Sequence, residues 1–324
     1  METNDPVPLA TPPHRPVRPI QCYLAYACAL AAGYVVWRLS IRPGFPLEPL
    51  WAMLLVSCTA TLVIWVFSIA NGNSSIYDPY WVIAPPFLAV AFAVGAGGLA
   101  GSLTSRQAII LVALVAWAAR YHLFYAWSGW RTGLVHEDWR YERMRSAPLP
   151  YWFNSLVGMH LFPTVLVYFA FIPAALVLGA DSPESGLRLL DLIGAAGALA
   201  AVTIEFAADR QLKSYHLTDE YRNGGTCRTG MWKVSRHPNY FGETLFWLSM
   251  VPIAASAGFL QSSRFLVLAG PIVMAIFFRF SSWLMDKRSL ERRPGYAVVM
   301  QEVSAMVPWW PRKADPERRH AAAR

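Results

Sequence analysis

The sequence predicts an all-α, polytopic integral membrane helix bundle with about eight spans. Of its 324 residues, 55% are hydrophobic and only 15% are charged, whereas a soluble globular chain is about 25% charged. The apolar residues gather in runs of the length that a bilayer-crossing helix needs, about 20 residues. No alternating pattern is long enough for a β-barrel. This composition excludes a disordered protein and a nucleic-acid-binding protein.

Eight apolar runs account for the predicted spans. Two of them, about 80–100 and 152–179, contain prolines, which membrane helices tolerate where neighbouring helices satisfy the freed carbonyls. No small-residue cleavage site follows the polar N-terminal segment, so the first run is predicted to be a retained span. The predicted spans are about 20–39, 50–70, 80–100, 106–127, 152–179, 187–207, 243–260 and 265–284.

The basic residues predict how these spans are oriented. Most of the 28 lysines and arginines fall in the two tails and in the loops 71–79, 128–151 and 208–242. Because basic residues collect in cytoplasmic loops, both termini are predicted to be cytoplasmic. The same bias explains the net charge of +8 without a nucleic-acid partner. The opposite loops hold only Arg38, Arg42, Arg106, Arg188 and Arg264.

The chain is expected to divide into four parts. Residues 1–19 form a polar cytoplasmic tail, and residues 20–70 form N-terminal membrane spans. A membrane domain covers residues 71–312, and residues 313–324 form a basic, disordered tail near anionic lipid.

One polar segment stands out where the chain re-enters the membrane. Residues 236–243 read RHPNYFGE and bring five polar side chains to a boundary that needs few. Pro238 restricts the backbone, and the Asn239 amide can both donate and accept hydrogen bonds. A carboxylate such as Glu243 is costly there without a partner. A ligand-binding turn explains this set more economically than an N-cap with an interfacial anchor, which is the structural alternative.

Other patterns in the sequence have simpler explanations. Residues 95–100 match the dinucleotide pattern GxGxxA but follow no strand, so the fingerprint lacks its context. The histidines form no HxxxH pair and the cysteines no CxxC, so no metal site is predicted. His122 and His160 could ligate a haem, but a polar contact between helices is far more common. Residues 137–145 are predicted to be a solvated, mixed-charge stretch, or else a wall over a cofactor.

The segment SRHPNYFGE at 235–243 resembles the signature of the steroid 5-alpha-reductase-like membrane family. The resemblance extends to its bacterial branch, whose members carry the C-terminal steroid dehydrogenase domain, and covers roughly residues 70–312. The short RHPxY core is shared with isoprenylcysteine-type methyltransferases, so the ordered set of segments is more specific than the core. The other similar segments are 75–81, 137–141, 208–211, 230–233 and 292–296.

The resemblance implies a seven-helix reductase with one added N-terminal span and a cavity for NADPH that opens to the cytoplasm. A hydride passes to the β carbon of an enone whose oxygen is polarised by an acid and a tyrosine. Asp78 is similar in position to the acid, usually Glu, and Tyr121 is expected to be the tyrosine, with Tyr125 and Tyr77 as competitors. The family often has Asn where this chain has Glu205. The expected cofactor-binding residues are Glu205, Asp209, Lys213, Arg228, Arg236, His237, Asn239, Tyr240 and Glu243. Among them Lys213, Arg228 and Arg236 are the candidates for binding the phosphates, because phosphate recognition needs cations.

The expected activity is NADPH-dependent reduction of a carbon–carbon double bond in a lipophilic, steroid- or isoprenoid-like substrate. One alternative is an S-adenosylmethionine-dependent methyltransferase of the isoprenylcysteine type. Another is a non-enzymatic lipid-binding membrane protein. The resemblance implies a bacterial inner membrane, with membrane lipid and the substrate as partners, and the sequence leaves the oligomeric state open.

Overall fold

The computed structural model describes residues 17–42, 44, 47–95, 103–128, 137–180, 186–293 and 295–312. Within these ranges the chain is helical and contains no strand, so the all-α class is confirmed. The two predicted tails, apart from residues 17–19, and most of the GxGxxA pattern lie outside the described residues. The side chain of Tyr125 also lies outside them.

The helices follow one another closely along the chain. In order they are α1 (Pro19–Ser40), α2 (Pro49–Asn71), the 3₁₀ turn η1 (Ser74–Ile76), α3 (Tyr77–Tyr80), α4 (Ala84–Gly95), α5 (Ser105–Ser128), α7 (Trp139–Arg145), α8 (Tyr151–Asn154), the π-helical η2 (Ser155–Leu161), α9 (Phe162–Leu178), α10 (Leu189–Tyr215), α11 (Asp219–Arg222), the 3₁₀ turn η3 (Gly230–Lys233), α12 (Pro238–Leu248), α13 (Met250–Ser256), α14 (Phe259–Ser262), α15 (Arg264–Arg292) and α16 (Tyr296–Glu302).

Among the described residues, five helices are long and apolar enough to cross a membrane, or up to six with one bent pair. The bent pair joins Ser74–Tyr80 to Ala84–Val94 at 48°. The sequence predicted about eight spans. One difference lies at 243–260, which divides into α12, α13 and α14. Pro252 contributes to this break because it has no N–H for the carbonyl one turn earlier.

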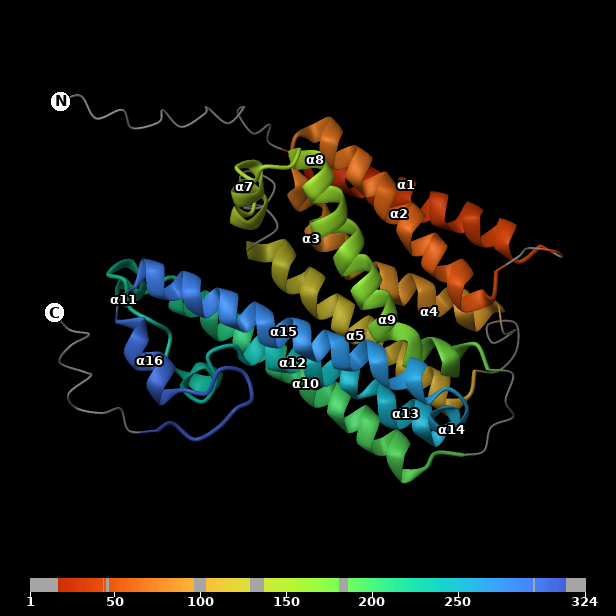
Figure 1. The fold of residues 1–324 in the computed structure, drawn as a ribbon. Helices are drawn as coiled ribbons and strands as arrows, with labels where there is room; N and C mark the ends of the chain where they lie inside the picture. Colours follow the sequence, from red (N-terminus) through yellow and green to blue (C-terminus); the bar gives the residue numbers. More distant parts are fainter. Residues whose placement is uncertain are drawn as a thin grey trace.

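Three helix pairs form the body of the bundle (Figure 1). α1 lies along α2, α9 along α15, and α10 along α12. Small residues allow the close approaches: a Cβ on Gly33 of α1 would lie 3.3 Å from Val56, and one on Gly270 of α15 would overlap the backbone of Phe169. The outer faces stay apolar, as with Phe265 at 79% exposure and Leu199 at 70%. Such faces suit contact with lipid tails.

The polar segments gather at one end of this bundle, on the left in Figure 1. That end holds the last turns of α5, α10 and α15 together with α7, α11 and α16. We call it the polar end. It brings together the loops that the sequence predicts to be cytoplasmic, although they are far apart along the chain. Every candidate site residue below lies toward this end or just inside it.

Candidate functional site

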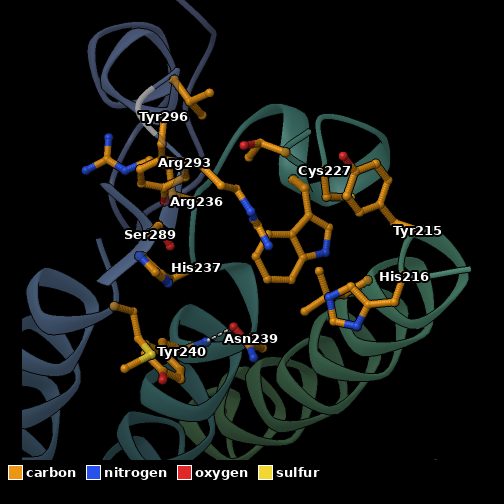
Figure 2. Close-up of a pocket in the computed structure, with 15 residues that line it drawn as sticks. Tyr215, His216, Cys227, Arg236, His237, Asn239, Tyr240, Ser289, Arg293 and Tyr296 are labelled. Atoms are coloured by element: carbon orange, nitrogen blue, oxygen red, sulfur yellow. Dashed lines mark hydrogen bonds between the residues drawn. The ribbon is translucent and has the colours of Figure 1, made fainter. Parts of the chain in front are cut away.

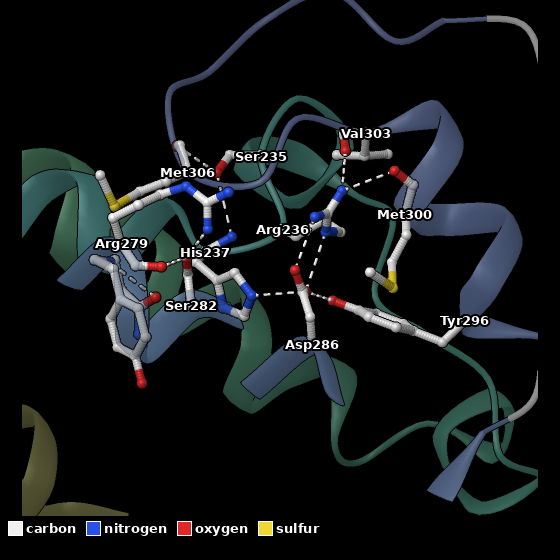
Figure 3. A network of polar contacts seen from close by, with 12 residues as sticks. Ser235, Arg236, His237, Arg279, Ser282, Asp286, Tyr296, Met300, Val303 and Met306 are labelled. Atoms are coloured by element: carbon white, nitrogen blue, oxygen red, sulfur yellow. Dashed lines mark hydrogen bonds and ion pairs between the residues drawn. The ribbon is translucent and has the colours of Figure 1, made fainter. Parts of the chain in front are cut away.

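The turn at Arg236 and His237 is held by one carboxylate, that of Asp286 on α15 (Figure 3). The Arg236 guanidinium donates two hydrogen bonds to Asp286, at 3.1 and 2.7 Å. His237 Nε2 lies 2.9 Å from the same carboxylate, and the Tyr296 hydroxyl donates to it at 2.8 Å. Burial and then Asp286 raise the pKa of the Tyr296 phenol, so Tyr296 stays a neutral donor. We call these four residues the Asp286 network.

The same turn fastens the C-terminal segment. The Arg236 guanidinium also donates to the carbonyls of Met300 and Val303, and its backbone N–H donates to that of Ser304 at 2.9 Å. The Ser235 hydroxyl donates to the Met306 carbonyl at 2.6 Å. All three guanidinium nitrogens of Arg236 therefore have hydrogen-bond partners within the protein. In this structure Arg236 stabilises the turn.

A second polar cluster lies deeper in the bundle, around Arg120 of α5. Arg120 is buried and pairs with Glu205 and with Asp209, the latter at 2.9 Å. It also lies 3.9 Å from Glu243. Glu205 and Asp209 are one turn apart on α10, so they share a helix face. We call these four residues the Arg120 cluster.

The chain around Glu243 is shaped to fit this cluster. The indole N–H of Trp117 donates to one carboxylate oxygen of Glu243 at 3.0 Å, and that of Trp247 donates to the other at 2.9 Å. A Cβ on Gly242 would collide with the Glu205 side chain. Glycine at this position is what lets α12 lie against α10. The cluster thus joins three predicted cofactor residues, Glu205, Asp209 and Glu243, through an arginine that the sequence analysis did not select.

A third group surrounds Asp78 of α3. The Tyr141 hydroxyl donates to the Asp78 carboxylate at 2.9 Å, and Arg140 lies 3.8 Å from it. The predicted partner, Tyr121, instead donates to the backbone carbonyl of Asp78 at 3.2 Å. The predicted pair is therefore brought together, but a different tyrosine contacts the acid. Tyr77, the described competitor, contacts Thr164 at 2.9 Å.

The segment that carries Tyr141 departs from the solvated stretch that the sequence predicted. Glu137 is 3% exposed and accepts hydrogen bonds from Ser74 N, the Tyr151 hydroxyl and Arg145, at 2.6–2.8 Å. Tyr141 is fully buried, whereas Glu142 and Arg143 are exposed. Only one face of α7 is therefore solvated. The sequence does contain a signal for this buried face, because the aromatic Tyr141 lies between charged residues on the same short helix.

A cavity of about 230 Å³ opens at the polar end, between α10, η3, α12, α15 and α16 (Figure 2). Four predicted cofactor residues line it: Arg236, His237, Asn239 and Tyr240. Lys213 and Arg228 do not line it, and Arg228 pairs with Glu302. The lining residues that the sequence analysis missed include Tyr215, His216, Trp232 and Arg293.

One hydrogen bond connects this cavity to the Arg120 cluster, and α5 connects that cluster to Asp78. The Asn239 amide, which lines the cavity, donates to Asp209 of the Arg120 cluster at 3.4 Å. Tyr240, the next residue, also lines the cavity. On α5, Arg120 faces the cluster while the next residue, Tyr121, contacts Asp78. The cavity, the Arg120 cluster and Asp78 therefore form one continuous polar region.

Comparison with known proteins agrees with this membrane architecture. Residues 64–303 match the family described as "Protein of unknown function (DUF1295)", so the chain belongs to that family. It is a steroid 5-alpha-reductase-like membrane family. An uncharacterized protein of Schizosaccharomyces pombe is 27% identical over 283 residues, which cover 81% of this chain and 80% of that protein. No solved structure matches the chain.

Proposed function

We propose that this protein is a membrane-embedded, NADPH-dependent reductase acting on the carbon–carbon double bond of a lipophilic enone. The observation that carries the proposal is the continuity of the polar region through α5. Arg120 ties together three carboxylates of the predicted cofactor site, and its neighbour Tyr121 contacts the predicted acid Asp78. A reductase needs just this proximity between a cofactor site and a proton donor.

The cavity residues suit one end of NADPH. Arg293 and His216 could face a phosphate, Trp232 offers an aromatic surface, and the Asn239 amide can bond a carboxamide. Ligand pockets are commonly about 300–1,000 Å³, so a cavity of about 230 Å³ would hold part of the cofactor. Within the Arg120 cluster, Arg120 Nε and Glu205 Oε1 are buried without a hydrogen-bond partner in the described structure.

The roles proposed for the chain's own residues follow from charge and position. NADPH, when bound, supplies a hydride to the β carbon of the enone. Asp78 and Tyr141 would polarise the enone oxygen, because a buried acid and phenol can both donate hydrogen bonds there. A proton then reaches the α carbon, which leaves a saturated ketone. The apolar faces of the bundle would admit a substrate dissolved in the membrane.

The proposed substrate class is steroid- or isoprenoid-like, and the proposed location is a bacterial inner membrane with the polar end in the cytoplasm. Among the described residues, most lysines and arginines fall in the segments of the polar end, which supports that orientation. A cofactor cavity at this end would be reached by cytoplasmic NADPH.

A binding titration on detergent-purified protein tests the proposal. Quenching of tryptophan fluorescence would be followed with NADPH, NADH and S-adenosylmethionine in turn. We expect saturable NADPH binding that weakens about tenfold or more in Asn239→Ala, because the variant loses one hydrogen bond in the cavity. Asn71→Ala is the matched control, since Asn71 pairs with Gln21 and does not line the cavity.

Enone reduction would then be assayed with NADPH and a panel of steroid and isoprenoid enones. Binding of S-adenosylmethionine without NADPH would replace the proposal with a methyltransferase. Absence of binding by all three ligands would remove the basis for an activity and favour the lipid-binding alternative.

A further inference from the structure

The Arg120 cluster holds more acidic groups than basic ones. The carboxyl groups of Glu205, Asp209 and Glu243 surround one guanidinium. If all three were ionised, two negative charges would have no counter-ion beside them. A carboxyl group buried without a counter-ion takes up a proton rather than remain charged. The charge balance therefore favours at least one retained proton in this cluster.

The hydrogen bonds indicate which carboxyl group carries that proton. Both oxygens of Glu243 accept from indole N–H groups. Asp209 accepts from Arg120 with one oxygen and from Asn239 with the other. Glu205 pairs with Arg120 through Oε2, whereas its Oε1 is buried and has no donor among the described residues. A protonated Oε1 would be a donor itself, and the Glu243 carboxyl group beside it can accept the hydrogen bond.

The surroundings of Glu205 limit where its proton can go. Three charged groups act on it: Arg120 from α5, Glu243 from α12 and Asp209 from its own helix. α13, which also lies against α10, contains no ionisable residue. Glu205 is 2% exposed, while the Asp209 side chain is 22% exposed and contacts the cavity residue Asn239. Asp209 is thus the member of the cluster nearest to solvent.

We propose that Glu205 holds a proton at neutral pH, shares it with Glu243, and exchanges it with the polar-end cavity through Asp209. The site is a proton-binding site inside the membrane bundle, and it does not depend on NADPH or on the proposed reduction. Glu137 provides the contrast within the same chain. It is equally buried, but both of its oxygens accept hydrogen bonds, and one donor is the Arg145 guanidinium.

Infrared spectroscopy of the full chain in lipid nanodiscs tests this inference directly. A protonated carboxyl group has a carbonyl band that is distinct from the carboxylate bands and shifts in D₂O. We expect Glu205→Gln to lose one carboxyl equivalent of this band at neutral pH. Glu137→Gln, the matched control, should leave the band unchanged. An unchanged band in Glu205→Gln would overturn the proposal, and so would loss of the band in Glu137→Gln.

A second variant, Glu243→Gln, tests whether Glu205 and Glu243 share the proton. It also provides an independent test in case Glu205→Gln does not fold. With Gln at 243, the remaining two carboxylates and Arg120 reach the same total charge as the protonated wild-type cluster. Glu243→Gln should therefore also lose the band, because Glu205 can ionise against Arg120. A retained band in Glu243→Gln would overturn the sharing. Circular dichroism of each variant confirms that its helical content matches the wild type before the spectra are compared.

Discussion

The Asp286 network and the Arg120 cluster lie on opposite sides of the same turn, and their charges are arranged in opposite ways. In the Asp286 network, a single carboxylate accepts hydrogen bonds from Arg236, His237 and Tyr296. In the Arg120 cluster, a single cation faces three carboxyl groups. In the first arrangement each polar group has a hydrogen-bond partner, and the network stabilises the fold. The second leaves polar atoms without partners, which is more typical of a functional site.

Removing the carboxylate of the Asp286 network should lower the stability of the folded protein more than the other variants do. Asp286→Asn leaves Arg236 buried without its counter-ion, and breaking a buried pair in this way costs about 3–5 kcal/mol. Thermal unfolding in detergent, followed by circular dichroism, measures the loss. The control Asp219→Asn breaks an exposed pair with Arg222 and should change stability by less than about 0.5 kcal/mol. Equal effects of the two variants would mean that Asp286 does not hold the turn.

Distorting the Arg120 cluster should have a smaller effect on stability. In Gly242→Ala the added methyl group collides with Glu205, and overpacking of this kind costs about 1–3 kcal/mol. The same variant should weaken any ligand that depends on the cluster. Gly295→Ala is the control, because nothing lies within 4 Å of a Cβ there. If both glycine variants unfold at the same temperature, α10 and α12 are not in the close contact described.

Removing one hydrogen-bond donor from the Asp286 network should have the smallest effect on stability. Tyr296→Phe takes one hydroxyl from Asp286, which keeps Arg236 and His237, so we expect a loss of about 1 kcal/mol. Denaturation of the variant would be compared with that of Tyr34→Phe, whose ring is 48% exposed. A loss of stability as large as that of Asp286→Asn would show that Arg236 and His237 cannot hold Asp286 without Tyr296.

The sequence predicted the parts of the fold that depend on local composition. The apolar runs at 20–39 and 50–70 became α1 and α2 nearly residue for residue, because run length and hydropathy set a membrane helix. The run at 243–260 did not become one span. Apolar content alone does not predict where packing against neighbouring helices bends the chain. The prediction of one span also did not include a break at Pro252.

The site was predictable only where residues are close in sequence. Glu205 and Asp209 share a face of α10 by helical spacing alone, and Asn239 with Glu243 follows from one motif. The roles of Arg120 and Asp286 depend on which helices lie together, and one sequence does not contain that information. Asp286 did offer a signal, since an acid inside a long helix near the membrane boundary needs a partner. The charges around Tyr141 predict a solvated helix, so its sequence context does not distinguish it as a buried site residue.

The contacts between Arg236 and the carbonyls of residues 300–304 also bear on how the protein is made. The ribosome synthesises these carbonyls well after α10 and α12. Until then the arginine at the turn has no backbone acceptors from this segment, and Tyr296 is not available to Asp286. The polar-end cavity, which Tyr296 and Val299 help to line, is therefore completed only once α16 has been made. A chain that stopped before α16 would lack these two lining residues, so the shape of the cavity depends on a segment far along the chain from the turn.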